Sequence, residues 1–257
     1  MMGWRGRIGF LIPPGNPTVE PEMASLAPRG VSVHFHRMVA SGATGSLSGQ
    51  DERNRSQIAH LQDTADLLAL VKPGVMVMAH TAMSYTLGRE AEAALVDRMQ
   101  ARYDRPFVTA FGSVVAALRH LGIDRVAYAT PYSPETTLQG KAHLESYGFA
   151  VPAFGHLPGV TNIYDETAER AYALARLVDR PEAQAVFLSG VGMPTLEAID
   201  LLERDLGKPV ISSASAMMWN ALRALGVGAS VPGGGRLLAT MGTAPAATAL
   251  SSPDPGA

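Results

Sequence analysis

The stretch DRPFVTAFGSVVAALRHLG (Asp104–Gly122) decides the fold, because a similar stretch, GKPVISSASAMMWNALRALG (Gly207–Gly226), recurs later in the chain. The two align with a gap of one residue. Each is preceded by a similar apolar run, VMVMAHTAM (Val75–Met83) in the first case and AVFLSGVGM (Ala185–Met193) in the second. Two pairs of segments in the same order indicate a duplicated α/β unit. The alternative is chance recurrence, since such strand–helix units are common in α/β proteins.

Short apolar runs occur along the whole chain and are bounded by Gly, Pro or polar residues, which is typical of buried parallel strands. The predicted strands are Arg7–Ile12, Val31–Phe35, Val75–Met78, Phe107–Ala110, Arg125–Ala129, Ala185–Leu188 and Val210–Ile211. Between these runs, apolar residues recur at i, i+3 and i+4, as on one face of a helix. The pattern is clearest in 58–69, 91–99, 171–178 and 195–206. This alternation predicts an α/β fold with two pseudo-symmetric parallel-sheet subdomains.

The repeat also predicts how the chain divides. We expect residues 1–112 plus 213–240 to form the first α/β subdomain and residues 113–212 the second. The active site should lie in the cleft between them, because open α/β sheets bind ligands at the carboxyl ends of their strands. The Gly- and Ser-rich segment Ala40–Asp51 is either a lid over this cleft or an ordinary connection. The small, Pro-rich residues 241–257 are predicted to be a disordered tail.

The composition limits the class of protein. The chain has 257 residues, of which 47% are hydrophobic and 17% charged, with a formal net charge of -2. These values are typical of a folded protein and do not suggest a basic surface for nucleic acid. We find neither a secretory signal at Met1–Pro14 nor an apolar run long enough to span a bilayer. We therefore expect a cytoplasmic protein with no nucleic-acid or membrane partner; a homo-oligomer is left open.

The chain contains no cysteine, which excludes disulfides, thiolate nucleophiles and cysteine-ligated metals. The motif HFH (His34–His36) places two imidazoles on one face of a strand, but no nearby residues supply further zinc ligands. We therefore expect no metal site. The sequence also lacks the Gly-rich dinucleotide motif after a strand, so no cofactor is expected.

Polar loops follow several of the predicted strands and should meet at one edge of the fold. They are IPPGNPTVEPE (Ile12–Glu22), AHTAMSYTLG (Ala79–Gly88), TPYSPETT (Thr130–Thr137), PGVTNIYDE (Pro158–Glu166) and LSGVGMPTLEAI (Leu188–Ile199). These loops share amide, hydroxyl and backbone N–H groups near predicted helix N-termini. Such groups suit the binding of a carboxylate or an enediolate.

The span from Arg7 to about Leu238 resembles the aspartate/glutamate racemase superfamily, in particular its maleate cis-trans isomerase and arylmalonate decarboxylase branch. The stretches that carry the resemblance are RIGFLIPPGNPTVEPE, TPYSPETT, MPTLEAIDLLERDLGKPVISS and ALGVGASVPGGGRLL. The resemblance implies two pseudo-symmetric α/β halves with the active site between them. It also implies proton chemistry, without a cofactor, beside a bound carboxylate.

The resemblance further implies roles for single residues. Asn16 falls where maleate isomerases hold a substrate carboxylate, and Asn162 matches a second carboxylate-binding amide. Tyr132 falls where both branches place a phenol, and Thr81 matches an anion-binding threonine of the decarboxylases. Three consecutive residues after a predicted strand are expected to border the substrate as well: Ser189, Gly190 and Val191.

At the two catalytic positions of the family, this chain departs from the family's usual pattern. Racemases and maleate isomerases hold a cysteine at each, whereas this chain has His80 in the first half and Gly190 in the second. Arylmalonate decarboxylases show the opposite asymmetry, with glycine at the first position and cysteine at the second. Because Gly190 offers only a backbone N–H, a racemase with two bases is not favoured. No thiolate is present to add to an alkene.

We therefore predict acid–base chemistry on only one face of the substrate. His80 would act as a general acid or base with an ordinary pKa near about 6.5, and Tyr132 would help to stabilise the developing oxyanion. We expect a cofactor-independent decarboxylase, lyase or isomerase that acts on a small carboxylate or dicarboxylate. The alternatives are a maleate isomerase-like or racemase-like activity, a hydrolase or hydratase in which His80 activates water, and an inactive protein that binds a small acid.

Each candidate residue also has a purely structural alternative. His80 would then be a packed, inert histidine at a strand end, and Tyr132 a phenol of the core. Asn16 would be a turn residue, and Asn162 a helix N-cap.

Overall fold

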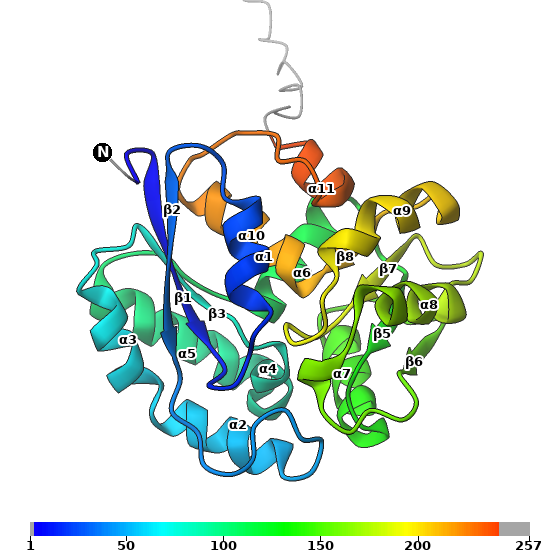
Figure 1. Ribbon diagram of the computed structural model, residues 1–257, viewed down its shortest axis with the longest axis horizontal. Coiled ribbons are helices and arrows are strands. Elements are labelled where there is room, and N and C mark those ends of the chain that lie inside the picture. The colour runs from blue at the N-terminus through cyan, green and yellow to red at the C-terminus, as the bar shows by residue number, and fades with distance from the viewer. Residues whose placement is uncertain (1–2, 242–257) are drawn as a thin grey trace, which may run out of the picture.

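The computed structural model describes residues 3–241, in which the strands form two four-stranded parallel sheets (Figure 1). The strand order is β2-β1-β3-β4 in the first sheet and β6-β5-β7-β8 in the second. The first sheet contains β1 (Gly6–Ile12), β2 (Val31–Arg37), β3 (Val75–Met78) and β4 (Phe107–Thr109). The second contains β5 (Val126–Thr130), β6 (Phe154–His156), β7 (Ala185–Leu188) and β8 (Val210–Ser212). The two orders correspond strand by strand, as the duplicated unit predicts.

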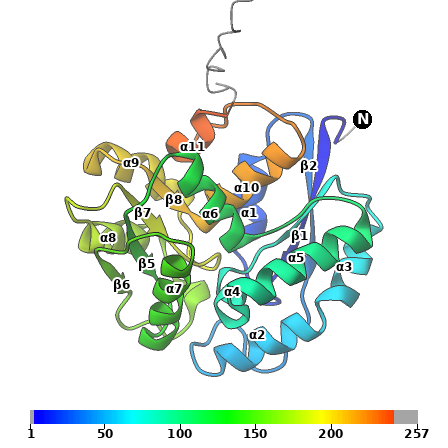
Figure 2. The same ribbon diagram turned by 180° about the vertical axis from the view of Figure 1, so that it is seen from behind.

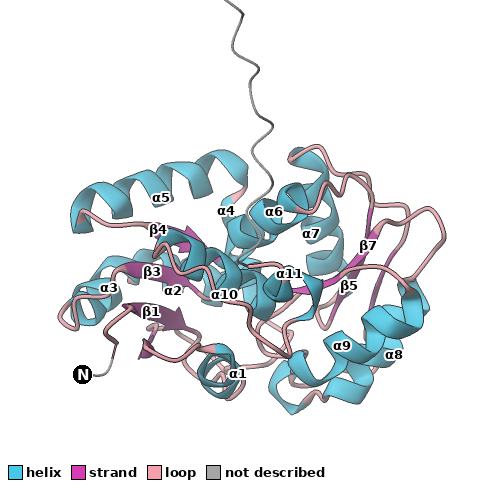
Figure 3. Cartoon of the chain, turned by 90° about the horizontal axis from the view of Figure 1, so that it is seen from above, coloured by secondary structure: helices cyan, strands magenta, loops and turns pink. Residues whose placement is uncertain are grey.

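Helices pack around both sheets, as the views from behind and from above show (Figures 2 and 3). The helices of the first part of the chain are α1 (Val19–Leu26), α2 (Gln50–Ala59), α3 (Leu61–Ala69), α4 (Thr81–Leu87), α5 (Arg89–Tyr103) and α6 (Ala110–His120). Those that follow are α7 (Pro134–Ser146), the 3₁₀ helix η1 (Ile163–Asp165), α8 (Ala168–Val178), α9 (Leu196–Leu206), α10 (Ser213–Ala224) and α11 (Gly235–Ala239). This arrangement confirms the predicted α/β class.

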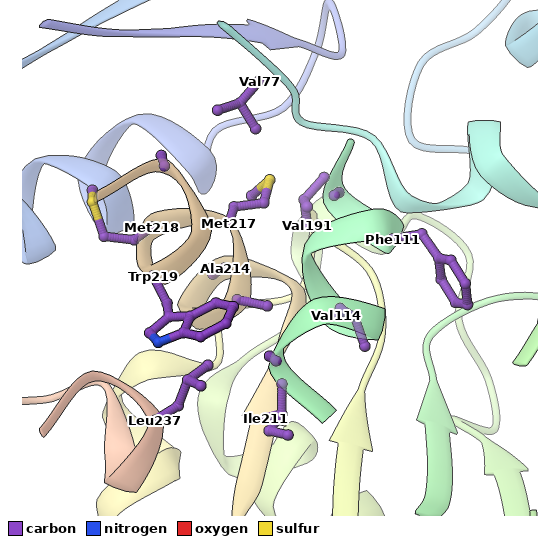
Figure 4. Close-up of a cluster of buried hydrophobic side chains, with 14 of the residues drawn as sticks. Val77, Phe111, Val114, Val191, Ile211, Ala214, Met217, Met218, Trp219 and Leu237 are labelled. Atoms are coloured by element: carbon purple, nitrogen blue, oxygen red, sulfur yellow. The ribbon is translucent and has the colours of Figure 1, made fainter. Parts of the chain in front are cut away.

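The central core lies between the two sheets, where α6 packs against α10. Trp219 and Met217 of α10 are buried there, and Figure 4 shows them with Val114 of α6 and Leu237 of α11. Full burial of one such side chain contributes about 1.5–3 kcal/mol relative to its exposure. The two helices of the sequence repeat thus join the two halves of the molecule.

Both repeat helices begin with the same type of cap, which explains where each strand ends. The Thr109 hydroxyl accepts a hydrogen bond from the Gly112 N–H at 2.8 Å, and the Ser212 hydroxyl accepts one from the Ser215 N–H at 3.1 Å. Each cap satisfies a backbone donor in the first turn of its helix.

Several sequence predictions need correction. The short edge strand β6 is missing from them, and it leaves Phe154 44% exposed. The helical pattern over 58–69 is divided at His60 between the end of α2 and the start of α3. Within the helical pattern predicted over 171–178, Leu177 is an exception, because it is 64% exposed. The buried positions of α8 follow i, i+3, i+4 and i+7 from Ala171, and position 177 lies off that stripe.

The predicted carboxyl-terminal tail also differs in part from what the structure describes. Residues 242–257 lie outside the described part of the chain, so their predicted disorder stays a prediction, as do the subdomain boundaries. Met241, which was assigned to the tail, is described and belongs to the central core. Over the described residues, no helix has the length and apolar character needed to cross a bilayer.

Candidate active site

A cavity with a free volume of about 30 Å³ lies between the two halves. The loops after β1, β2 and β3 and the helix α2 line it from the first half, and the loops after β5 and β7 and the helix η1 line it from the second. The polar wall contributed by the first half consists of Asn16, Thr44, Gln50, Arg53, Asn54, Gln57 and His80.

His80 lies on the cavity wall at the N-terminus of α4, directly after β3, and is 9% exposed. Its Nδ1 atom is buried and has no hydrogen-bond partner. Burial, together with the positive charge of Arg53, lowers the pKa of His80 to about 4. The expected pKa near about 6.5 is therefore wrong, because burial penalises the charged imidazolium. At neutral pH the ring is neutral and can accept a proton.

Arg53 supplies the positive charge of the site from α2. It is 9% exposed, and its guanidinium donates hydrogen bonds to the carbonyl of Ser48 at 2.5 Å and to the carbonyl of Ser46. Within residues 3–241, Arg53 is the one lysine or arginine on the cavity wall, and neither aspartate nor glutamate lines it. Because a guanidinium has five N–H donors, the two bonds leave others free for an anion.

Tyr132 contributes a phenol from the second half. The side chain is 2% exposed and lines the cavity. Burial raises the pKa of Tyr132 well above its ordinary value, although hydrogen bonds with Ser189 and Thr81 oppose the shift. The phenol is therefore protonated at neutral pH and can donate a hydrogen bond. A Cβ added to Gly190 would lie 3.1 Å from the Tyr132 hydroxyl oxygen, so this oxygen is close to the second family position.

Asn16 connects the two halves beside the cavity. Its Oδ1 accepts hydrogen bonds from the N–H groups of Thr18 at 2.8 Å and Val19 at 2.9 Å, at the start of α1. Its Nδ2 donates to the carbonyl of Val191 at 3.0 Å. Both Asn16 and Val191 line the cavity. The amide nitrogen of Asn16 has a second N–H that it can offer to a ligand.

Other predicted site residues lie behind the cavity wall. The Thr81 hydroxyl is buried and donates to the Ser213 hydroxyl at 2.9 Å. The Ser189 hydroxyl is hydrogen-bonded to the Tyr85 hydroxyl at 2.8 Å. Neither residue, nor Gly190, is among those that line the cavity. These residues support Tyr132 from behind and do not form the surface of the cavity.

Asn162 caps the 3₁₀ helix η1. Its Oδ1 accepts a hydrogen bond from the Tyr164 N–H at 3.0 Å, which is the structural alternative that we gave for this residue. Asn162 is not among the residues that line the cavity, although its neighbours Ile163 and Tyr164 are. The resemblance therefore indicated a loop that borders the cavity, but the side chains next to Asn162 form the wall.

The segment Ala40–Asp51 covers the cavity. Ala40, Thr44, Gly45 and Gln50 all line it. The carbonyl of Gly45 accepts a hydrogen bond from the Ile163 N–H at 2.9 Å, so the segment reaches the second half. Figure 1 shows the same path, in which the connection from β2 to α2 extends toward the second sheet. The segment is thus a cover over the site and not simply an exposed connection.

The sequence predictions missed the polar residues of α2, although the sequence contains a signal for them. Gln50, Arg53, Asn54 and Gln57 follow the spacing i, i+3, i+4 and i+7, and they are the buried residues of α2. A buried helix face is normally apolar. Each buried polar atom without a partner costs about 1–3 kcal/mol, so a polar stripe of this kind indicates a binding site.

Comparison with known proteins identifies the family. The family model described as arylmalonate decarboxylase matches residues 8–238. The chain belongs to the arylmalonate decarboxylase family. It is 33% identical over 236 residues to an arylmalonate decarboxylase from Bordetella bronchiseptica, which covers 90% of this chain and 95% of that protein. It is 32% identical over 247 residues to a maleate isomerase from Nocardia farcinica (strain IFM 10152), which covers 92% of this chain and 96% of that protein.

Solved structures of family members have the same fold. The maleate cis-trans isomerase of Nocardia farcinica, as a cysteine-to-serine mutant with a covalently bound succinylcysteine intermediate, matches with a TM-score of 0.83 and 28% identity. The match covers 91% of this chain and 98% of that one. These relatives confirm the resemblance, the fold and the prediction of an isomerase- or lyase-type enzyme. Because this chain has no cysteine, it cannot form a succinylcysteine.

Proposed function

We propose that this protein is a cofactor-independent enzyme that moves a proton at the carbon next to a carboxylate of a small acid. His80 is the proton-transfer residue. One observation carries the proposal: the buried Nδ1 of His80 has no protein partner and belongs to a residue on the wall of a cationic cavity. A packed, inert histidine would normally have its buried nitrogen hydrogen-bonded.

The carboxylate of the acid binds at Arg53. Free N–H donors of this guanidinium suit a carboxylate, and no competing carboxylate lines the described cavity. The protonated phenol of Tyr132 and the remaining N–H of Asn16 are further donors on the wall. Together these groups stabilise the negative charge that develops on the carboxyl oxygens when the neighbouring carbon loses a proton.

The neutral imidazole of His80 takes a proton from that carbon. The electron pair of the C–H bond moves into the adjacent C–C bond, which gives an enediolate and an imidazolium. The imidazolium then returns the proton to the same carbon or, in a conjugated acid, to another carbon. A pKa of about 4 keeps the imidazole unprotonated at neutral pH before the ligand binds, and it also makes the ring a weaker base than an ordinary histidine.

Decarboxylation of a malonate-type acid would reach the same enediolate. The bond from the carbon to one carboxylate breaks, CO₂ leaves, and the electron pair remains in the enediolate. The carbon must then receive a proton, so His80 would have to become protonated during the reaction. Negative charge on the bound acid favours this protonation by offsetting the charge of Arg53.

Proton exchange with deuterated water tests the proposal without knowledge of the product. The protein is incubated with malonates, maleate, fumarate and amino acids, and deuterium incorporation at carbon is measured by NMR. We expect incorporation with at least one acid, and a loss of about 100-fold or more in His80→Asn, as for a general base. The exposed His120 provides the matched control, His120→Asn, which should keep the parent rate.

Two results would count against the proposal. If acids bind but none exchanges, the chain is a binding protein for small acids. If His80→Asn exchanges as fast as the parent, another group moves the proton.

A further inference from the structure

The buried face of α2 is polar throughout the part that meets the cavity. Gln50, Arg53, Asn54 and Gln57 are between 3% and 9% exposed, and all four line the cavity. Their spacing places them on one stripe of the helix. The proposed function uses only Arg53, as the cation that binds the carboxylate. The amides on both sides of it remain to be explained.

Two of these amides have an acceptor without a partner. The Asn54 Nδ2 donates to the carbonyl of Ala82 at 3.2 Å and to the Thr86 hydroxyl at 3.0 Å. Because a backbone carbonyl only accepts, these bonds fix which end of the Asn54 amide is the nitrogen. The Oδ1 of Asn54 is buried without a partner, and so is the Oε1 of Gln57. Each side chain is 3% exposed.

An unpaired acceptor is complemented by a donor and not by a second acceptor. The ionised carboxylates of a simple dicarboxylate offer only acceptor oxygens. Maleate, the ligand in the solved structure of a Pseudomonas putida S16 maleate isomerase mutant, is such an acid. The amide oxygens of Asn54 and Gln57 would therefore repel it. A hydroxyl, an amine or an amide N–H on the ligand would pair with them.

We propose that α2 recognises a hydrogen-bond-donating substituent, so that the ligand is a hydroxy-, amino- or amido-substituted carboxylic acid. Asn54 and Gln57 are the specificity-determining residues. The inference rests on the proposed function for the carboxylate end of the ligand, which binds at Arg53. Because Arg53 lies on the same helix face as the two amides, the carboxylate and the donor group bind close together. The donor is therefore on a carbon near the carboxylate.

Matched ligands test this inference by binding alone. Malate, aspartate and N-acetylaspartate carry a donor on the carbon next to a carboxylate, whereas methylsuccinate has a methyl group at the corresponding carbon. Their dissociation constants are measured by isothermal titration calorimetry with the parent protein. We expect at least one donor-bearing acid to bind about tenfold or more tightly than methylsuccinate, since a buried acceptor without a partner is unfavourable. The three donors distinguish hydroxyl, amine and amide.

The variant Gln57→Met keeps the length of the side chain and removes its acceptor. It should lose most of the preference for the donor-bearing acid while it binds methylsuccinate at least as well as the parent. The matched control is Gln62→Met, since Gln62 is exposed on α3. Thermal unfolding of both variants checks that they fold. Asn54 is a less suitable target, because its Nδ2 also holds α4 through Ala82.

The results separate this inference from the proposed function. Equal binding of donor-bearing and methyl-substituted acids, or an unchanged preference in Gln57→Met, would overturn the role of α2. Deuterium exchange that depends on His80 would still support the proposed function. A preference for donors without any exchange would support the role of α2 and reject the catalytic role of His80.

Discussion

Replacement of Arg53 by glutamine tests the electrostatics of the candidate site. The pKa of His80 falls from 6.5 to about 4, a difference of 2.5 units. At about 1.4 kcal/mol per pKa unit, this corresponds to about 3 kcal/mol against the imidazolium. Burial is the larger cause and Arg53 the second. Because burial persists in Arg53→Gln, we expect the pKa of His80 to rise and to stay below 6.5.

The same shift makes the stability of the protein depend on pH. The unfolded chain binds a proton at His80 more readily than the folded protein does. The titration of His80 therefore leaves the free energy of unfolding unchanged above pH 6.5. As the pH falls from 6.5 toward 4, this titration lowers the free energy of unfolding. The loss reaches about 3 kcal/mol in the parent and should be smaller in Arg53→Gln.

NMR of a histidine-labelled protein measures this pKa directly, and the spectrum of His80→Asn assigns the signal. The matched control is Arg55→Gln: Arg55 is exposed, and its Nε bonds Asp51 Oδ2 at 2.8 Å on the outer side of the same helix. This control should leave the pKa unchanged. A parent His80 that titrates between about pH 6 and 7, or an Arg53→Gln variant with the parent pKa, would refute the electrostatic argument.

Two further predictions concern stability. Glu22 accepts hydrogen bonds from the N–H groups of Thr195 at 2.7 Å and Leu196 at 3.1 Å, and burial raises its pKa from 4.5 to about 7. The stability that the protonated Glu22 provides is therefore present below pH 4.5 and is lost as the pH rises through 7. In urea unfolding, the stability of Glu22→Gln relative to the parent should increase by up to about 3 kcal/mol between pH 5 and 8. Parallel pH profiles of the two proteins would contradict this. Gly190→Ala should destabilise by about 1–3 kcal/mol, because φ is +95° and the new Cβ would lie 3.1 Å from the Tyr132 hydroxyl oxygen. Thermal unfolding should show a smaller loss for Gly148→Ala, where φ is +92° but no atom lies within 4 Å, and equal losses would exclude the contact as a cause.

The sequence alone determined the fold, and it predicted where the site would lie. Strands covered on both faces appear as continuous apolar runs, which is why β3 and β7 are predicted to the residue. The repeat that contains α6 and α10 indicates the duplicated sheets. The resemblance to the family predicted roles for His80, Asn16 and Tyr132, in the loops that follow β3, β1 and β5. The apolar strands and the polar loops that follow them are local features, so near neighbours in the chain are sufficient to predict them.

Only the tertiary structure decided which side chains form the cavity. It brings Arg53 and Gln57 of α2 to the wall beside His80, and it places Thr81 and Ser189 behind that wall. It also lowers the pKa of His80, which the sequence suggested would be ordinary. The physical reason is that a cavity is bounded by elements far apart in the chain. Burial and charge–charge interactions depend on distances through space, and the periodicity of the sequence does not contain them.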